Sequence, residues 1–520
     1  MKASPKKLLF LSLALAGSLA AEVKLASPFT DHMVLQREMR VPVWGTAEAG
    51  AQVTVEFAGQ KKSTTAGADG KWRIALDPLA ASADARDFAV TAANRDSKIE
   101  NLKLSDVLVG EVWLGSGQSN MVFPLSKTKA RWAGVVNEEQ EIAAASHPRI
   151  RIFTARDTKA YEPQPTVAGT WEVCTPETAP GLSAIGYYFA RELQKELNVP
   201  IGFLTVASGA SCAEAWFSRE AFVGNAQLKF MLDSLDESVA YFRATPQGAP
   251  DKAPVRPTPI NKPRAPVTRL SDPVRDQHFA TVLFNGMLSP VIPYAIRGAL
   301  WYQGESICWG TRGLDLYGET QQAMVKDWRA RWGQGDFPFY LVQLPGQENI
   351  SNNPRIREEQ MEVLALPKTG LAVTIDVGEA KDVHPHNKTP VAHRLARLAL
   401  ADVYGRKLES RSPMLAALRV QGGTARVTFK HASGLVAKGG ALKGFQIAGA
   451  DQKFVDAEAR IEGDAVLVSS AQVAAPVAVR YGWSNYPEGM GCNLFSAADL
   501  PAAPFRTDNW SYPIAGLIEH

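Results

Sequence analysis

Residues 110–121 of this 520-residue chain read GEVWLGSGQSNM and join the end of a strand to a glycine-rich turn and a serine. The apolar run DVLVGEVWL at residues 106–114 is typical of a buried parallel strand. The Gly-Ser-Gly turn that follows allows a sharp bend and a close approach of substrate. If a helix begins next, its free N–H groups can hold an oxyanion beside Ser119. The segment therefore indicates a nucleophilic serine, although many turns of this composition have no chemical role.

A second polar segment supplies a candidate base. The sequence TIDVGEAKDVHPHNK at residues 374–388 follows another apolar run and holds Asp382, His384 and His386 within five residues. A histidine on a loop at a strand end can accept the serine proton, and a nearby carboxylate can fix its tautomer. A solvated polar loop and a metal site are the alternatives. The proline between the histidines opposes a helical ligand pair, and no cluster with zinc spacing is nearby, so we expect no metal and no cofactor.

Six segments, in order, resemble the sialate O-acetylesterase branch of the SGNH hydrolases. They are SPFTDHMVLQREMRVPVWGTA, GEVWLGSGQSNM, IRGALWYQGES, FPFYLVQL, DVHPHNK and LPAAPFRTDNW, and together they extend over nearly the whole mature chain. The resemblance implies an esterase that removes acetyl groups from sugars without a cofactor. It implies Ser119 as the nucleophile, His384 as the base and Asp382 as the acid that orients the histidine.

The chain departs from the wider superfamily at the acid. The superfamily has its acid three residues before the histidine, where this chain has Lys381, whereas Asp382 is two residues before His384, as in this branch. A Ser–His dyad, or orientation of the ring by a backbone carbonyl, therefore stays open beside the triad. The branch also commonly has Cys where Gly115 stands, which should matter little for the chemistry.

The resemblance also implies an oxyanion hole. Its donors would be the backbone N–H of Ser119, the backbone N–H of Gly209 and the side-chain amide of Gln303, which stands where the superfamily has Asn. The branch usually has Gly-Gly where this chain has Gly-Ala at residues 209–210. Gln303 and Glu305 can alternatively form a structural hydrogen-bond pair at a strand end.

Aromatic residues near these motifs suit a sugar ligand, because the apolar faces of sugars stack on rings. Trp216, Trp301 and Trp483 are more typical of a core, since most tryptophans are buried. Trp309 stands beside a glycine in a polar loop and is the aromatic residue expected to be exposed. We expect Trp309 and Glu305 to contact the substrate.

The apolar patterns divide the chain into four parts. Residues 1–20 form a leader, residues 21–104 a β-sandwich-like unit of short alternating runs, and residues 406–520 a β-rich region. Between them, residues 105–405 alternate strands with helices, which predicts an α/β domain with a parallel sheet, here the SGNH hydrolase core with helices on both faces. The expected helices include residues 184–197, 317–332 and 354–366, and the expected strands include residues 201–207 and 371–375.

The first twenty residues are typical of a secretory signal. Three lysines precede an apolar run at residues 8–19, and small residues at Ser18 and Ala20 fit a cleavage site. We expect cleavage near Ala20 and export to the periplasm or the medium. The alternative, an uncleaved anchor, is opposed by the shortness of the run, because a membrane span needs about 20 apolar residues.

The charge balance excludes some partners. The chain has 56 basic and 53 acidic residues, a net charge of +3, and the three lysines of the leader account for the excess. A neutral mature surface gives no electrostatic reason to expect nucleic acid or a membrane as partner. Recognition of an anionic sugar would have to be local. The expected partner is an O-acetylated carbohydrate, and nothing indicates the oligomeric state.

Four cysteines, Cys174, Cys212, Cys308 and Cys492, can form up to two disulfides in three full pairings in an exported chain.

These observations favour an exported serine esterase acting on O-acetylated sialic acids through an acetyl-enzyme on Ser119. An acetyl xylan or xyloglucan esterase is the alternative within the same class. A non-catalytic carbohydrate-binding protein is the alternative from another class, and the presence of Ser119, Asp382 and His384 argues against it.

Overall fold

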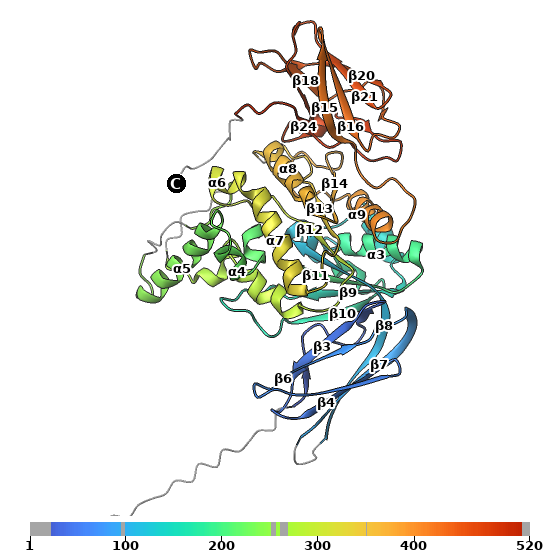
Figure 1. Ribbon diagram of the computed structural model, residues 1–520, viewed down its shortest axis with the longest axis vertical. Coiled ribbons are helices and arrows are strands. Elements are labelled where there is room, and N and C mark those ends of the chain that lie inside the picture. The colour runs from blue at the N-terminus through green and yellow to red at the C-terminus, as the bar shows by residue number, and fades with distance from the viewer. Residues whose placement is uncertain (1–21, 95–98, 251–255, 261–268, 350, 512–520) are drawn as a thin grey trace, which may run out of the picture.

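The computed structural model describes residues 22–94, 99–250, 256–260, 269–349 and 351–511. It arranges them as N-terminal strands, a central α/β region and C-terminal strands, one after another along the long axis (Figure 1). The expected leader, residues 1–20, lies outside the described residues. Within the described ranges, no helix has both the length and the apolar character needed to cross a membrane.

The N-terminal strands form two layers. One is a three-stranded sheet with the order β1-β3-β6. In the other, β4 pairs with β5 and β7, and β7 and β2 pair with the first part of β8. Alternation of buried and exposed residues along β4 and β6 points one face of each strand into the core. The bounds are β1 Lys24–Leu25, β2 Val34–Gln36, β3 Val41–Thr46, β4 Gln52–Phe57, β5 Gln60–Thr65, β6 Lys71–Leu76 and β7 Ser82–Ala93.

Strand β8 (Ile99–Gly117) belongs to two regions of the molecule. Its first half is antiparallel to β7, and its second half lies in the central sheet between β11 and β12. The burial pattern changes at the same point, from alternation to a continuous buried run. A strand covered on both faces needs such a run. The boundary expected between residues 104 and 105 thus falls inside one continuous strand.

The central sheet has the order β10-β9-β11-β8-β12-β13-β14. Every neighbouring pair from β9 to β14 is parallel, and only the edge pair β10–β9 is antiparallel. The bounds are β9 His147–Ala155, β10 Gly169–Cys174, β11 Ile201–Ala207, β12 Gly298–Tyr302, β13 Phe339–Val342 and β14 Thr369–Ala372. The chain is therefore a mixed α/β protein with all-β regions before and after the α/β region.

Helices pack against this sheet through large side chains. Helices α3 and α9 contact each other and the strands beneath them, and Phe189 of α3 packs edge-on against Trp113 of β8. On β13, Phe339 packs against Trp328 of α7, whereas the hydroxyl of its neighbour Tyr340 lies 3.4 Å from a carbonyl of α9. Successive strand residues point to opposite faces. The bounds are α2 Glu138–Ala143, α3 Ala184–Leu197, α4 Arg219–Val223, α5 Lys229–Ala244, α6 Gly310–Asp315, α7 Tyr317–Trp332, α8 Asn353–Met361 and α9 Thr389–Asp402.

The helix ends follow from local sequence. The hydroxyl of Ser183 accepts the N–H of Gly186 and caps α3, which ends at Asn198 in a left-handed conformation. Helix α7 ends at Gly333, which also has a positive φ. Helices α3 and α7 thus have the expected bounds, whereas the expected helix at residues 354–366 is divided between α8 and a 3₁₀ turn at Glu362–Ala365. The last strand begins two residues before the expected 371–375.

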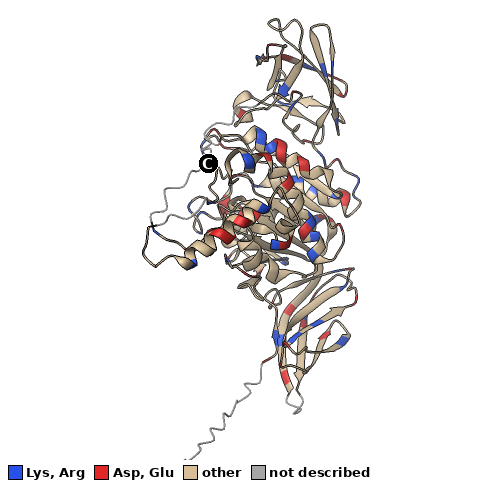
Figure 2. Cartoon of the chain, turned by 60° about the vertical axis from the view of Figure 1, so that its left-hand side comes forward, with Lys and Arg blue, Asp and Glu red and all other residues tan. Residues whose placement is uncertain are grey.

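The C-terminal strands form two four-stranded sheets and one strand pair. One sheet has the order β15-β16-β21-β20, the other β19-β18-β22-β24, and β17 pairs with β23. The bounds are β15 Met414–Gln421, β16 Thr424–Lys430, β17 Val436–Ala437, β18 Phe445–Ala448, β19 Val455–Asp456, β20 Glu458–Glu462, β21 Ala465–Ser469, β22 Ala478–Tyr481, β23 Leu494–Phe495 and β24 Phe505–Arg506. Basic and acidic residues are interspersed along the helices and strands (Figure 2).

A buried carboxylate fastens the N-terminal strands to the central sheet. Glu111, fully buried at the middle of β8, accepts hydrogen bonds from Arg37 (2.6 Å), from Arg297 (2.7 and 3.1 Å) and from Gln36 (3.0 Å). Burial alone would raise the pKa of Glu111, but the hydrogen bonds and the charge of Arg297, followed by the hydrogen bonds of Arg37 and Gln36, hold that pKa below its ordinary value.

We expect Glu111→Gln to destabilise the protein by about 3–5 kcal/mol at neutral pH, because it leaves two arginines without their buried counter-charge. A lowered folded pKa contributes stability above the ordinary value of 4.5, and that stability is lost as the pH falls through the folded pKa. The difference between wild type and variant should therefore shrink below about pH 4.5. Denaturant unfolding at several pH values measures it.

The matched control is Glu56→Gln, which removes an exposed carboxylate paired with Lys61 on the same sheet. It should change the unfolding midpoint very little, because exposed ion pairs contribute little. Equal effects of the two substitutions would contradict the structural role of Glu111.

Candidate active site

Three neighbouring strands of the central sheet end level with one another. Gly117, the last residue of β8, is in register with Ala207 at the end of β11 and with Tyr302 at the end of β12. The residues that follow, Ser119, Gly209 and Gln303, therefore lie at the same edge of the sheet. The carboxyl edge of an open parallel sheet is where ligands commonly bind.

The turn before Ser119 requires glycine. Gly117 has a φ of 130°, and a Cβ there would lie 2.2 Å from the carbonyl oxygen of Tyr302. A Cβ on Gly115 would lie 2.4 Å from the ring of Phe203. This ring therefore fills the space that would be taken by the side chain of the Cys common at this position in the branch that the sequence resembles. Helix α1 (Ser119–Val122) then begins at the serine itself, which is 9% exposed.

The structure brings Ser119 and His384 into contact. The His384 Nε2 atom lies 2.8 Å from the Ser119 hydroxyl oxygen, within hydrogen-bond distance. Residues 373–388, between β14 and α9, form the loop that holds His384, here called the histidine loop. Strand β14 is separated from β8 by β12 and β13. The loop must therefore cross the ends of both strands to reach the serine.

Several contacts hold this crossing loop in place. Arg394 of α9 forms two hydrogen bonds to Asp376 (2.7 and 2.6 Å). Ala380 accepts the backbone N–H of Glu348 at 3.0 Å. From the C-terminal region, Glu488 accepts the N–H of Gly378 at 2.6 Å. The loop is thus supported by the end of the α/β region and by the C-terminal region together.

Comparison with known proteins gives one consistent family. Residues 282–404 match the family described as "Carbohydrate esterase, sialic acid-specific acetylesterase". Sialate O-acetylesterases of Rattus norvegicus and Homo sapiens are each 28% identical over 93% of this chain, covering 94% and 92% of those proteins. A crystal structure described as a novel carbohydrate acetylesterase from Xanthomonas citri is 34% identical, with a TM-score of 0.77 over 94% of this chain and 100% of that one. The chain belongs to the sialate O-acetylesterase family. It is accordingly a carboxylic ester hydrolase.

In this chain, Asp382 lies close to two nitrogen atoms of His384. Its Oδ1 atom accepts the backbone N–H of His384 at 2.8 Å and lies 3.4 Å from Nδ1 of the same residue. The second distance exceeds that of an ordinary hydrogen bond. Catalytic hydrogen bonds are often long in unliganded sites and tighten when charge develops. The geometry therefore suits both a loop-shaping carboxylate and an acid that steadies the imidazolium.

The expected oxyanion donors differ in their surroundings. Gly209 is exposed, and a Cβ on it would lie 3.9 Å from the Cβ of Ser119, so its backbone is close to that serine. Gln303 is fully buried; its amide nitrogen donates to the carbonyl of Ser211 (3.0 Å), and its oxygen accepts from the hydroxyl of Tyr317 (2.5 Å). One amide hydrogen of Gln303 is thus engaged within the protein.

The expected substrate contacts are more buried than the sequence suggested. Glu305 is 8% exposed and accepts a hydrogen bond from the side chain of Asn120, the residue after Ser119. Trp309 is half-buried; its indole N–H donates to Glu214 (2.9 Å), and its ring packs edge-on against Phe230. Burial raises the pKa of Glu214 to about 7, and its backbone N–H and Trp309 oppose that shift.

Sequence reasoning missed Trp132. Its ring centroid lies 4.6 Å from that of His384, and the side chain is 37% exposed. Trp216 and Trp301 are fully buried, and Trp483 is nearly so, as core tryptophans are. Trp132 stands in a polar segment thirteen residues after Ser119, and only its nearness in sequence to that serine could have indicated it.

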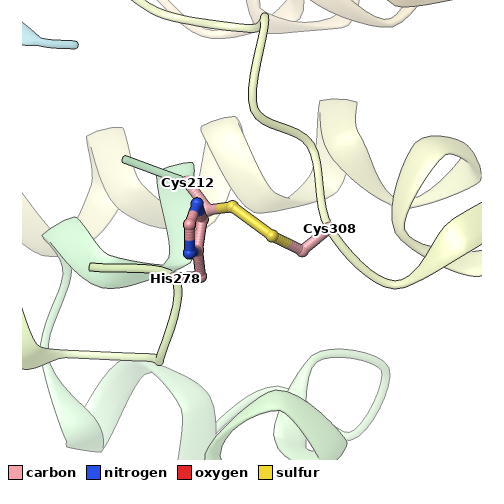
Figure 3. A group of neighbouring side chains, drawn as sticks. All are labelled: Cys212, His278 and Cys308. Atoms are coloured by element: carbon pink, nitrogen blue, oxygen red, sulfur yellow. A yellow bond between two sulfur atoms is a disulfide. The ribbon is translucent and has the colours of Figure 1, made fainter. Parts of the chain in front are cut away.

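A disulfide joins two of the loops at this edge. Cys212 follows the Gly209 turn, Cys308 follows the Gln303 segment, and the two are bonded, with the ring of His278 beside them (Figure 3). Cys174 and Cys492 are free thiols, and burial raises the pKa of each to about 12. Of the two possible bridges, this structure has one.

Two groups in the described part of the chain have the spacing of metal ligands. Cys212, His278 and Cys308 are one, but the sulfurs are bonded to each other. Glu379, Asp382 and His386 are the other. There, the Nδ1 atom of His386 lies 2.9 Å from the carboxylate of Glu379, and Asp382 already accepts a backbone N–H of the loop. These hydrogen bonds already engage Glu379, Asp382 and His386 within the loop.

We expect Asp382→Asn to lower kcat by about 10²–10⁴-fold with folding intact, because the amide keeps the loop hydrogen bond but removes the charge that steadies the imidazolium. Steady-state kinetics and a thermal melt measure the two effects. A loss of less than about tenfold would mean that Asp382 only shapes the loop.

His386→Ala is the control for the choice of histidine. The ring of His386 contacts Glu379 and not Ser119, so most activity should remain. A loss as large as that of His384→Ala would show that the wrong histidine was assigned.

Proposed function

We propose that this protein removes O-acetyl groups from sugars, with O-acetylated sialic acids as the substrate class. The observation that carries the proposal is the 2.8 Å contact between Ser119 and His384 at the carboxyl edge of the sheet, in a member of the sialate O-acetylesterase family. A further part of the proposal is the fold type, an SGNH hydrolase core with helices on both faces. The packing of Phe339 toward α7 and of Tyr340 toward α9 supports it.

The proposed reaction has two halves. In the first, the Ser119 hydroxyl attacks the acetyl carbonyl while His384 accepts its proton, and His384 then protonates the departing sugar oxygen. In the second, His384 activates water, which releases acetate from the acetyl-enzyme. The backbone N–H groups of Ser119 and Gly209 and the amide of Gln303 are the proposed oxyanion donors, and each such donor typically supplies about 3 kcal/mol.

Local charge supports an anionic sugar. Lys127, Lys129 and Arg131 are exposed in the segment that leads to Trp132, whose ring lies against His384. A sialic acid carries a carboxylate that such cations attract, and its apolar face can stack on an indole. The chain as a whole has little net charge, so this segment offers the local recognition that an anionic substrate needs.

A neutral acetylated glycan is the second candidate. The similar protein from Xanthomonas citri is described only as a carbohydrate acetylesterase, which includes such substrates. We propose further that the protein is exported, with residues 1–20 removed as a signal peptide.

Ser119→Ala should fold and lose turnover by about 10⁴–10⁶-fold, because no other group can form the acetyl-enzyme. Acetate release from a panel of O-acetylated sialic acids and acetylated xylo-oligosaccharides measures activity and substrate class together. The wild type should prefer the sialic acids, and its KM for them should rise with salt. An active Ser119→Ala protein would contradict the mechanism, and preference for the neutral sugars would contradict the substrate class alone.

Trp132→Ala should raise KM for sugar acetates about tenfold, the effect of losing a stacking contact of about 1.4 kcal/mol. Trp309→Ala is the matched control. It should have a smaller effect on KM, because Trp309 is turned toward Glu214 and Phe230. A larger effect at Trp309 would restore it as the stacking residue.

A further inference from the structure

A buried lysine lies close to the catalytic pair. Lys388 is four residues after His384, immediately before helix α9, and is 1% exposed. Its ammonium lies over the ring of Phe123 at 4.3 Å and over that of Tyr302 at 5.5 Å. Lysine is almost never fully buried unless it has partners.

The partner of Lys388 is the residue next to the nucleophile. Its Nζ atom donates to the side-chain oxygen of Asn120. The side-chain nitrogen of Asn120 donates in turn to Glu305 (2.5 Å) and to the backbone carbonyl of Val383 (2.9 Å). Asn120 is fully buried, so these hydrogen bonds are shielded from water.

The arrangement joins the two halves of the catalytic pair. Asn120 is adjacent in sequence to Ser119, and Val383 is adjacent to His384. One amide side chain therefore bridges the nucleophile turn and the histidine loop, and Lys388 fixes which way that amide points. With its oxygen held by an ammonium, the amide must present its nitrogen to Val383 and Glu305.

The network has a cost in stability. Burial lowers the pKa of Lys388 to about 7, and the charges of Glu305, Glu379 and Asp382 oppose that shift. A folded pKa below the ordinary value of 10.5 means that the charged form is disfavoured in the folded state. An apolar side chain would avoid this cost, and charged groups that reduce stability are typical of functional sites.

We propose that Lys388 is a positioning residue: through Asn120 it sets the separation of Ser119 and His384, and its charge tunes the field around the histidine. This inference rests on the proposed function, in which those two residues are the nucleophile and the base. The charged groups that face the ammonium are Glu305 from the loop after β12, and Glu379 and Asp382 from the histidine loop.

Lys388→Met tests the proposal, because methionine keeps an unbranched chain and removes the ammonium. We expect kcat for 4-nitrophenyl acetate to fall on the order of 10²-fold, the effect of a small misplacement of catalytic groups, while KM changes by less than about threefold. We also expect the acid limb of the kcat/KM profile to move to higher pH, because the imidazolium loses a neighbouring positive charge. Thermal melts check that the variant folds, since the substitution also removes the donor that the buried side-chain oxygen of Asn120 has in the wild type.

The matched control is Lys381→Met, which removes an exposed lysine from the same loop and should change neither kcat nor the pH profile. If Lys388→Met fails to fold, Lys388→Gln replaces it. The glutamine can donate to Asn120 but carries no charge, so the acid limb should move as before. An unchanged pH profile in the folded variant, or equal effects at Lys381, would overturn the proposal.

Ser119→Ala in the same assay separates this inference from the proposed function. An inactive Ser119→Ala protein together with a fully active Lys388→Met protein overturns the role of Lys388 alone. An active Ser119→Ala protein overturns the proposed function itself.

Discussion

The register of strand β8 with β11 and β12 is the constraint on which the site depends. Gly117, Ala207 and Tyr302 are level, so the first residues after three strands meet at one edge. A shift of one residue in β8 would turn its buried side chains to the opposite face and move Ser119 away from its neighbours. Close packing at two glycines of β8 fixes this register. A Cβ on Gly110 would overlap the backbone of Pro200, and the ring of Phe203 fills the space over Gly115. Glu111 adds a buried ionic link in the same stretch.

The histidine has no comparable support from the sheet. Its loop begins after β14 and crosses two strand ends before it reaches Ser119. Long crossing loops lose conformational entropy when they are ordered, and only contacts along their length can offset that loss. Here the contacts come from α9 through Arg394, from the C-terminal region through Glu488, and from the turn beside Ser119 through Asn120. The C-terminal region also contacts the α/β region through Arg357 of α8, which donates to the carbonyls of Ser484 and Asn485.

Much of this arrangement could be predicted from local sequence, and the reasons are physical. Strand β11 and helices α3 and α7 have the expected bounds because periodicity and end signals agree there, as at Ser183 and Gly333. The strand before the histidine was placed two residues too late, since the apolar run continues into the crossing loop. Trp309 was expected to be exposed, and Trp132 was not singled out, because exposure depends on tertiary neighbours. The indole N–H of Trp309 donates to Glu214. Among the aromatic residues described, the ring of Trp132 contacts only those of His384 and Phe123.

Lys388 shows a different limit of sequence reading. It stands inside the DVHPHNK segment, yet a lysine two residues after the second histidine of a polar loop resembles a solvated charge. Only the fold shows that α9 begins at the next residue and that this side chain is buried against Asn120, the residue after Ser119. The same buried position explains why Asn120 and Glu305 are polar: once an ammonium is enclosed, its neighbours must accept its hydrogen bonds and balance its charge. Glu305 accepts a hydrogen bond from Asn120 in this enclosed group, which links the residue after Ser119 to the residue before His384, and its contact with the substrate stays a prediction.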